Sequence, residues 1–211
     1  CLSRLLLLIS STGFGAVLCA QAYIPMLDST AAWQDENAYS SPGPNTSGDE
    51  CLRYTIQGDS LVDGLTYKVL VRTGHISHTD HVFPNESWTQ WFSGNYVGLL
   101  REDTAARRVF IRPAGWTYDW LLYDFSIGVG PYPFTYRYYG VEGLEVVDVD
   151  TIMLIDGPHR RFNFSNSGSM IEGVGDVAGF LPSWGSGEVH WMGTLVCQTR
   201  NDSTIYSGFN V

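Results

Sequence analysis

The residues of this sequence whose types and spacing suggest chemistry gather first between Gly74 and His81. His75, His78 and His81 stand three residues apart, and Asp80 lies among them. Imidazole and carboxylate groups are ligands of Zn²⁺, which needs three or four of them in a tetrahedral arrangement. Residues three apart on a strand point to opposite faces, so these histidines converge only in a turn or a helix. The alternative is an exposed loop that is rich in histidine.

A second set of acidic residues could bind calcium. Asp148 and Asp150 are two residues apart, so their carboxylates share one face of a strand, and Asp156 or Glu145 could complete a site. The alternative is that these acids solvate the outer face of a sheet.

Pairs of carboxylates could act as a general acid and a general base. Glu102 with Asp103 and Asp119 with Asp124 are the available pairs, but glycoside hydrolysis needs two carboxylates across a cleft. The sequence contains no Ser-His-Asp elbow, no Cys-His pair and no phosphate-binding glycine loop. We therefore expect a chain with no catalytic residues and no cofactor, and a metal-dependent hydrolase is the less favoured alternative.

Tryptophan gives the best indication of a ligand site. Trp88 and Trp91 lie in a polar stretch, where exposed rings could stack on sugars or anchor a protein partner. The alternative is that aromatic rings fill the core, which we expect for Trp33, Trp120 and Trp191. The sequence thus predicts ligand binding at Trp88 and Trp91.

The first residues have the pattern of a signal peptide. Arg4 precedes an apolar run that is short and broken by Ser10, Ser11 and Thr12, so we expect no membrane span here. Ala20-Gln21-Ala22 fits the cleavage rule. We expect residues 1–22 to be removed, residues 23–211 to form one domain, and the protein to be secreted or held at the cell surface.

Two cysteines remain after such processing, Cys51 and Cys197. In an exported chain a pair of cysteines favours a disulfide. The alternative is two separate thiols.

The net charge of −10 limits the partners. Nucleic acids and anionic membrane surfaces both bind clusters of lysine and arginine. We therefore expect no nucleic acid partner.

The hydrophobic pattern predicts an all-β fold. Short apolar runs between Gly98 and Pro131 indicate three consecutive strands, and Asp63-Gly64 indicates a two-residue hairpin. No stretch shows a sustained helical period. We expect an antiparallel meander that forms a curled sheet, an open barrel or a sandwich, with residues 34–50 as an exposed loop and residues 74–95 as a long loop or a short hairpin.

Alternation within the expected strands predicts which side chains are buried. The expected core consists of Leu52, Tyr54, Ile56, Tyr67, Val69, Val109, Ile111, Leu122, Val147, Phe162 and Leu195.

Several short segments, in a fixed order along the chain, resemble those of a known protein family. They include GDSLVDGLTYKVL (58–70), LLREDTAARRVFI (99–111), WLLYDFSIGVG (120–130), RRFNFSN (160–166), MIEGVGDVAG (170–179) and LVCQTRNDSTIYS (195–207). Together they resemble the N-terminal β module of bacterial exported proteins that carry a type IX secretion system C-terminal sorting domain. The resemblance implies export and a β fold, and it implies no catalytic residues. The family usually continues into a sorting domain, which the 211 residues do not include, so we expect a longer parent protein.

These observations lead to one main functional hypothesis. We expect a non-catalytic, exported β domain that acts as a surface or extracellular interaction module. The alternative is a carbohydrate-binding accessory module that uses exposed tryptophans, so the expected partner is a glycan or a surface protein.

Overall fold

The computed structural model describes residues 22–41, 46–82, 86–133, 135, 143–181 and 190–208. The predicted signal peptide therefore lies, except for Ala22, outside the described residues. Strands dominate the part of the chain that is described, and the all-β prediction is confirmed. Across these residues we find no helix long and apolar enough to cross a membrane.

The described strands form two antiparallel sheets. In chain order the strands are β1 (Ala32–Ser41), β2 (Thr46–Val62), β3 (Leu65–Asp80), β4 (Glu86–Asp103), β5 (Arg108–Pro113), β6 (Trp120–Asp124), β7 (Gly130–Pro131), β8 (Glu145–Leu154), β9 (Gly157–Phe164), β10 (Ser169–Ile171), β11 (Gly175–Asp176), β12 (His190–Arg200) and β13 (Ser203–Ser207). The larger sheet has the order β13-β12-β1-β2-β3-β4-β5-β6, and the smaller sheet has the order β11-β10-β9-β8-β7.

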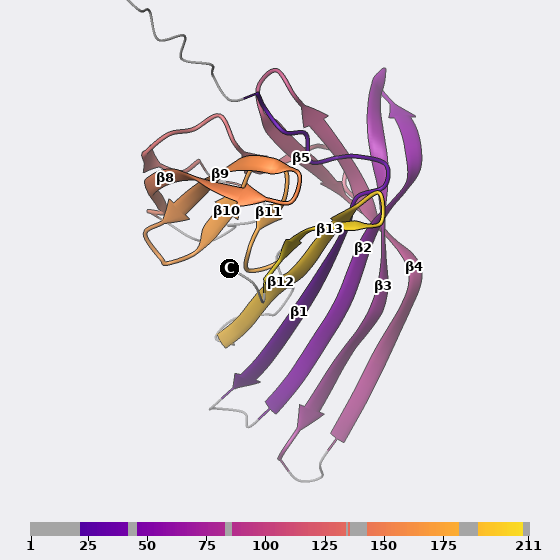
Figure 1. Ribbon diagram of the computed structural model, residues 1–211. Coiled ribbons are helices and arrows are strands. Elements are labelled where there is room, and N and C mark those ends of the chain that lie inside the picture. The colour runs from indigo at the N-terminus through magenta and orange to yellow at the C-terminus, as the bar shows by residue number, and fades with distance from the viewer. Residues whose placement is uncertain are drawn as a thin grey trace, which may run out of the picture.

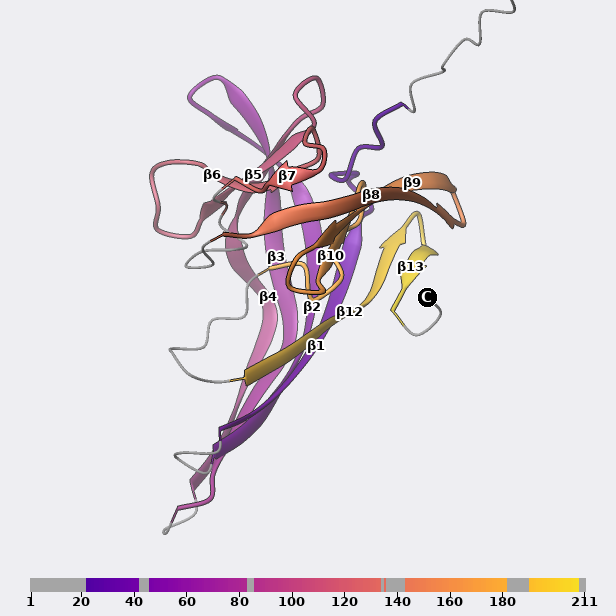
Figure 2. The same ribbon diagram turned by 90° about the vertical axis from the view of Figure 1, so that its left-hand side faces the viewer.

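The larger sheet curls into a half-barrel, and the smaller sheet packs inside the curl. Figures 1 and 2 show the smaller sheet against one end only, while β1 to β4 extend well beyond it. The predicted three-strand meander corresponds to the end of β4, β5 and β6. We call the side of the larger sheet that faces the smaller sheet the concave face, and the other side the convex face.

The hairpin between β2 and β3 confirms the turn predicted from Asp63-Gly64. Both residues have positive φ, +52° for Asp63 and +78° for Gly64. Such a two-residue turn matches the twist of the strands on either side of it.

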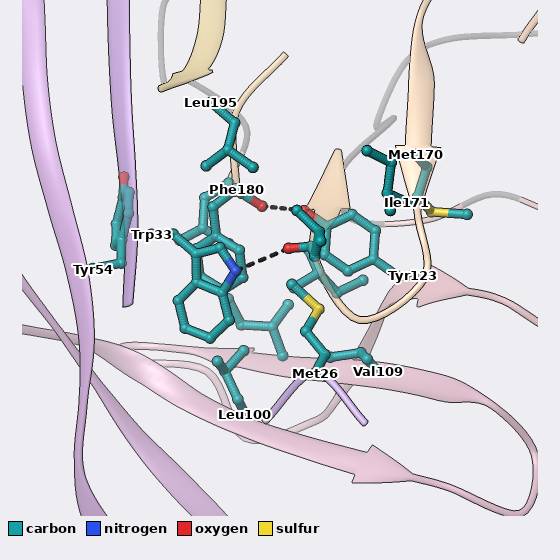
Figure 3. Packing of buried hydrophobic residues seen from close by; sticks show 14 of the residues in the cluster. Met26, Trp33, Tyr54, Leu100, Val109, Tyr123, Met170, Ile171, Phe180 and Leu195 are labelled. Atoms are coloured by element: carbon teal, nitrogen blue, oxygen red, sulfur yellow. Dashed lines mark hydrogen bonds between the residues drawn. The ribbon is translucent and has the colours of Figure 1, made fainter. Parts of the chain in front are cut away.

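Trp33 is at the centre of the core between the two sheets. Its indole ring is fully buried and stacks on Phe180 with ring centroids 4.2 Å apart. Its Nε1 donates a hydrogen bond to the carbonyl of Val174 at 2.9 Å, and Tyr123 donates its hydroxyl to the carbonyl of Phe180 (Figure 3). One continuous apolar cluster therefore includes residues of both sheets.

Most of the expected core is buried, and one strand was assigned to the wrong face. The fully buried members are Leu52, Tyr54, Tyr67, Val109, Ile111, Leu122, Phe162 and Leu195, while Ile56 and Val69 are half-buried. The prediction for Val147 was wrong, because its side chain is 53% exposed and Val146 is buried instead. The pairing of β8 with β9 shifts register between Val146 and Asp148. Such an irregularity breaks the alternation on which the prediction relied.

The two stretches that the sequence predicted to be loops are largely strands. Residues 34–41 and 46–50 belong to β1 and β2, and residues 74–80 and 86–95 belong to β3 and β4. These are the parts of the strands that extend beyond the smaller sheet in Figure 1. Polar side chains occupy most positions on both faces here, including the buried Asp35, Asn37 and Glu50, so the sequence shows no apolar alternation. Backbone pairing to the neighbouring strands holds them extended.

The predicted disulfide was also wrong, because Cys51 and Cys197 are free thiols. Strand β1 lies between them: Glu36 pairs with Cys51 on one side, and Gln34 pairs with Cys197 on the other. Neighbouring strands are about 4.8 Å apart, so the two cysteines are about two such steps apart. A disulfide needs Cα atoms within about 7 Å.

Candidate binding site on the concave face

The three histidines do not converge. Strand β3 carries His75 on the convex face and His78 on the concave face, and His81 follows its end. The Nε2 atom of His75 lies 3.0 Å from Asp49 Oδ2, and the Nε2 atom of His81 lies 2.8 Å from Ser47 Oγ. Within the described residues, no group of three or more His, Cys, Asp and Glu side chains is arranged to hold a metal ion.

The aspartates proposed for calcium have other partners. Arg161 forms two hydrogen bonds with Asp150, at 3.0 and 2.5 Å, which hold the pKa of that carboxyl below its usual range. Asp148 accepts a hydrogen bond from Asn163 at 3.3 Å. Asp156 lies 2.6 Å from His159 Nε2, so these oxygens serve interactions within the protein.

The candidate acid and base pairs are likewise used for structure. Glu102 accepts hydrogen bonds from the backbone of Met26 and Leu27 and from the hydroxyl of Tyr23. It thereby fastens the segment that precedes β1 to β4. The carboxylate of Asp124 lies 2.9 Å from Arg108 Nε, and that of Asp103 caps the turn after β4.

Trp88 and Trp91 lie on opposite faces of β4. Trp88 is 51% exposed on the concave face and stacks on His78 with ring centroids 5.5 Å apart. Trp91 is 73% exposed on the convex face and lies 4.9 Å from the ring of His75. Because strand neighbours three apart point in opposite directions, the two indoles cannot bind one ligand together.

A groove of about 380 Å³ opens on the concave face beside β4. Its walls come from β3, β4, β5 and the turn that follows β5. The ring of Trp116 lines it together with the side chains of Arg72, Gln90 and Phe92, and Tyr96 and Val97 of β4 border it. Trp116 is 41% exposed, so its ring is accessible to a ligand, whereas Tyr96 pairs with Val71 and its side chain lies on the face opposite Arg72.

A tight turn places Trp116 at the groove. The backbone N–H of Trp116 donates to the carbonyl of Pro113 at 3.0 Å. Gly115 occupies the third position of this turn with φ of +83°, a conformation that glycine adopts readily. Tyr118 and Trp120 pack around the ring of Trp116, with centroids 5.2 and 5.7 Å from it.

Trp88 lies on the same face of β4 as the groove. Trp88, Gln90 and Phe92 alternate along the strand, so all three side chains project from the concave face. The rise of a strand places Trp88 and Phe92 about 13 Å apart. The concave face therefore presents a line of ring and amide groups that begins at the groove and continues along β4.

Arg72 is the charged side chain of the groove. Its guanidinium stacks on the ring of Phe92, 3.9 Å from the centroid. Its Nε atom is buried and has no hydrogen-bond partner among the described residues. The neighbouring carboxylate of Glu50 accepts a hydrogen bond from Asn37 at 3.0 Å, and burial raises the pKa of Glu50.

Sequence reasoning found part of this site. It selected Trp88, and it selected Trp91, which lies on the other face. It missed Arg72 and Phe92, because nothing in the local pattern shows that β3 and β4 carry them beside the turn at Trp116. The proline and glycine before Trp116 were the available indication that this ring is fixed at a turn.

Comparison with known proteins adds no neighbour: no protein family model, no curated protein and no solved structure matches this chain. The fold and the geometry of the site therefore carry the functional argument.

Proposed function

We propose that this chain is a non-catalytic binding module of an exported protein and that its concave groove binds a carbohydrate chain. The observation that carries the proposal is the combination of Trp116 with Gln90 and Arg72 in one open groove. Sugar rings present C–H faces that pack on aromatic rings, and their hydroxyl groups hydrogen-bond with planar polar side chains. Trp88 extends the same face and would contact further sugar units of a chain.

The resemblance to bacterial exported proteins supports an extracellular location for this module. Export by a signal peptide would bring the module into contact with extracellular polysaccharides. A binding role also fits better than catalysis, because the candidate acid and base residues have structural partners. Asp124 pairs with Arg108, Glu102 accepts from backbone N–H groups and Asp119 accepts from Arg112.

A protein partner is the second candidate, and a different observation favours it. Strand β5 pairs with β4 only from Gly98 to Asp103. The outer edge of β4 from Glu86 to Val97 has no strand beside it among the described residues. An extended peptide could add to such an edge by backbone hydrogen bonds.

A glycan array tests the first candidate. We expect the 23–211 chain to bind a defined class of oligosaccharide, and we expect Trp116→Ala and Trp88→Ala each to weaken binding about tenfold or more, because they remove stacking surfaces. Trp91→Ala is the matched control, since this exposed ring lies on the convex face. Absence of glycan binding, or equal loss with Trp91→Ala, would contradict the proposed site.

A further inference from the structure

The first half of β4 forms an exposed edge of the larger sheet. Residues 86–91 are all exposed, and β3 pairs with them on one side. On the other side, β5 reaches along β4 only as far as Gly98, and the described part of the chain supplies no other strand. Figure 1 shows this part of β4 at the margin of the sheet. The backbone groups that point outward here therefore have no neighbouring strand among the described residues.

This edge lacks the features that protect most edge strands from pairing. Such protection comes from lysine and other charged side chains, from proline and from bulges. Residues 87–93, with the sequence SWTQWFS, contain no charged residue and no proline. They pair with β3 in unbroken register from Thr79 to Thr73, and the irregularity comes only beyond Thr73. The edge is thus regular, uncharged and rich in aromatic side chains, which is typical of a segment that pairs with another strand.

Internal hydrogen bonds mark where this edge ends. The backbone N–H of Ser93 donates to Asn95 Oδ1 at 2.9 Å. The carbonyl of Val97 accepts a hydrogen bond from the backbone N–H of Ala114, also at 2.9 Å. Both groups are engaged within the chain. The segment that can accept a strand is therefore 86–92.

The sequence of the edge is complementary to itself. If two copies align antiparallel with Gln90 opposite Gln90, Trp88 lies opposite Phe92 of the second copy and Thr89 lies opposite Trp91. Aromatic pairs and pairs of an aromatic with a β-branched side chain are favourable between neighbouring strands. Glu86 falls opposite Gly94, so no two carboxylates face each other. In a protein with a net charge of −10, such an uncharged seam lets two copies approach without contact between like charges.

We infer that β4 pairs antiparallel with β4 of a second copy of this chain, about a two-fold axis at Gln90. This inference rests on the second candidate function, the addition of a strand to this edge, and names the partner. The two larger sheets become one continuous sheet, and the concave faces of both copies lie on the same side of it. Because the seam is short, it buries less area than the about 1,200–2,000 Å² of a stable complex, so the dimer is a weak one.

An exchange of charges at the axis tests the inference. Analytical ultracentrifugation of the 23–211 chain should show a monomer at about 10 μM and a dimer as the concentration approaches about 1 mM. Gln90→Lys and Gln90→Glu each place like charges opposite each other, so each should weaken dimerisation about tenfold or more. An equal mixture of the two variants should restore the dimer. Both variants should fold, because Gln90 is exposed, and thermal melting checks this.

Gln57→Lys and Gln57→Glu are the matched controls, because Gln57 is an exposed residue of β2, which lies inside the sheet. These controls should dimerise as the native protein does. A native chain that stays monomeric to about 1 mM would overturn the inference. A mixture of Gln90→Lys and Gln90→Glu that stays monomeric would also overturn it.

Cysteine cross-linking tests the register in a chain with Cys51→Ser and Cys197→Ser. Gln90→Cys should form an intermolecular disulfide under mild oxidation, because the two residues face each other across the axis. Thr89→Cys should not, since its two copies lie diagonally about 8 Å apart, beyond the reach of a disulfide. Equal cross-linking of the two variants would contradict the two-fold pairing.

A synthetic peptide of residues 86–93 separates this inference from the function on which it rests. We expect the peptide to bind the chain and to compete with dimerisation. Binding of the peptide by a chain that stays monomeric would overturn the second copy as partner and leave strand addition standing. If neither the peptide nor a second copy binds, both are overturned, while glycan binding by the monomer would leave the groove as proposed.

Discussion

At the scale of single residues, Asp119 is where several side chains of the curled sheet converge. It accepts hydrogen bonds from Arg112 Nε at 2.8 Å, from the hydroxyl of Tyr67 at 2.8 Å and from Arg101 at 3.3 Å. Burial alone would raise the pKa of Asp119, but the hydrogen bonds from Arg112 and Tyr67 outweigh burial and hold it below its usual range. This carboxylate joins β3, β4 and β5 to the turn before β6.

Replacement of Asp119 by asparagine should make the free energy of unfolding depend less on pH in the acidic range. The folded-state pKa of Asp119 lies below its ordinary value of 3.8, so its contribution is complete above that value and is lost as the pH falls through the folded-state pKa. We expect Asp119→Asn to lose about 1–3 kcal/mol of unfolding free energy at pH 7. The difference from the native protein should shrink below about pH 4, as measured by urea unfolding at several pH values.

Asp63→Asn is the control for that experiment. The Asp63 carboxylate is 82% exposed and lies 3.8 Å from Arg112. An exposed pair of this kind contributes about 0–1 kcal/mol. Asparagine also tolerates the positive φ at this position. A loss for Asp119→Asn that stayed constant from pH 7 to pH 3 would contradict the role assigned to its carboxylate.

At the scale of elements, β2 and β3 approach each other closely at Gly74. A Cβ atom built at Gly74 would lie 2.0 Å from the carbonyl oxygen of Cys51, and the φ of Gly74 is +125°. This glycine pairs with Leu52 on one side and Phe92 on the other, just where the sheet passes beyond the core. The position therefore tolerates no side chain.

Gly74→Ala should destabilise the protein far more than Gly94→Ala. At Gly94 the φ is +74° and an added Cβ meets no atom within 4 Å, so the cost is backbone strain alone, about 1–3 kcal/mol. Gly74→Ala adds the clash with the backbone of β2, which costs about 1–3 kcal/mol more. Denaturant midpoints of the two variants measure this. Equal losses would show that the backbone at Gly74 can move away without penalty.

At the scale of the whole molecule, Trp33 is the side chain that links the two sheets. It lies on β1 of the larger sheet, and its stacking and hydrogen-bond partners, Phe180 and Val174, follow β10 and β11 of the smaller one. Because one apolar cluster spans both sheets, we expect them to unfold together.

Trp33→Ala should lower the stability of both sheets in a single transition. Loss of a fully buried indole costs about 3–5 kcal/mol through lost burial and the remaining cavity. Trp91→Ala, at a 73% exposed position, should change stability by no more than about 0.5 kcal/mol. Thermal unfolding followed by near-UV and far-UV circular dichroism compares the two. Two separate transitions in the native protein would contradict a shared core.

The sequence by itself determined the strands that have one buried face. Alternation placed Leu52, Tyr54 and Phe162 in the core, and the turn at Asp63-Gly64 was evident, because burial of one face leaves a period of two. Where strands extend beyond the smaller sheet, as at 34–41 and 74–80, both faces are polar and the period disappears. Only pairing with strands distant in sequence shows that they are extended.

The tertiary structure decided everything that depends on which strands are neighbours. It separated Cys51 from Cys197, since the insertion of β1 between β2 and β12 has no local signature. It placed His75 and His78 on opposite faces and did the same for Trp88 and Trp91. It also brought Arg72 from β3 beside Phe92 from β4 and near the turn at Trp116. A groove is a relation between distant segments, so residue types and spacing within any one segment do not contain it.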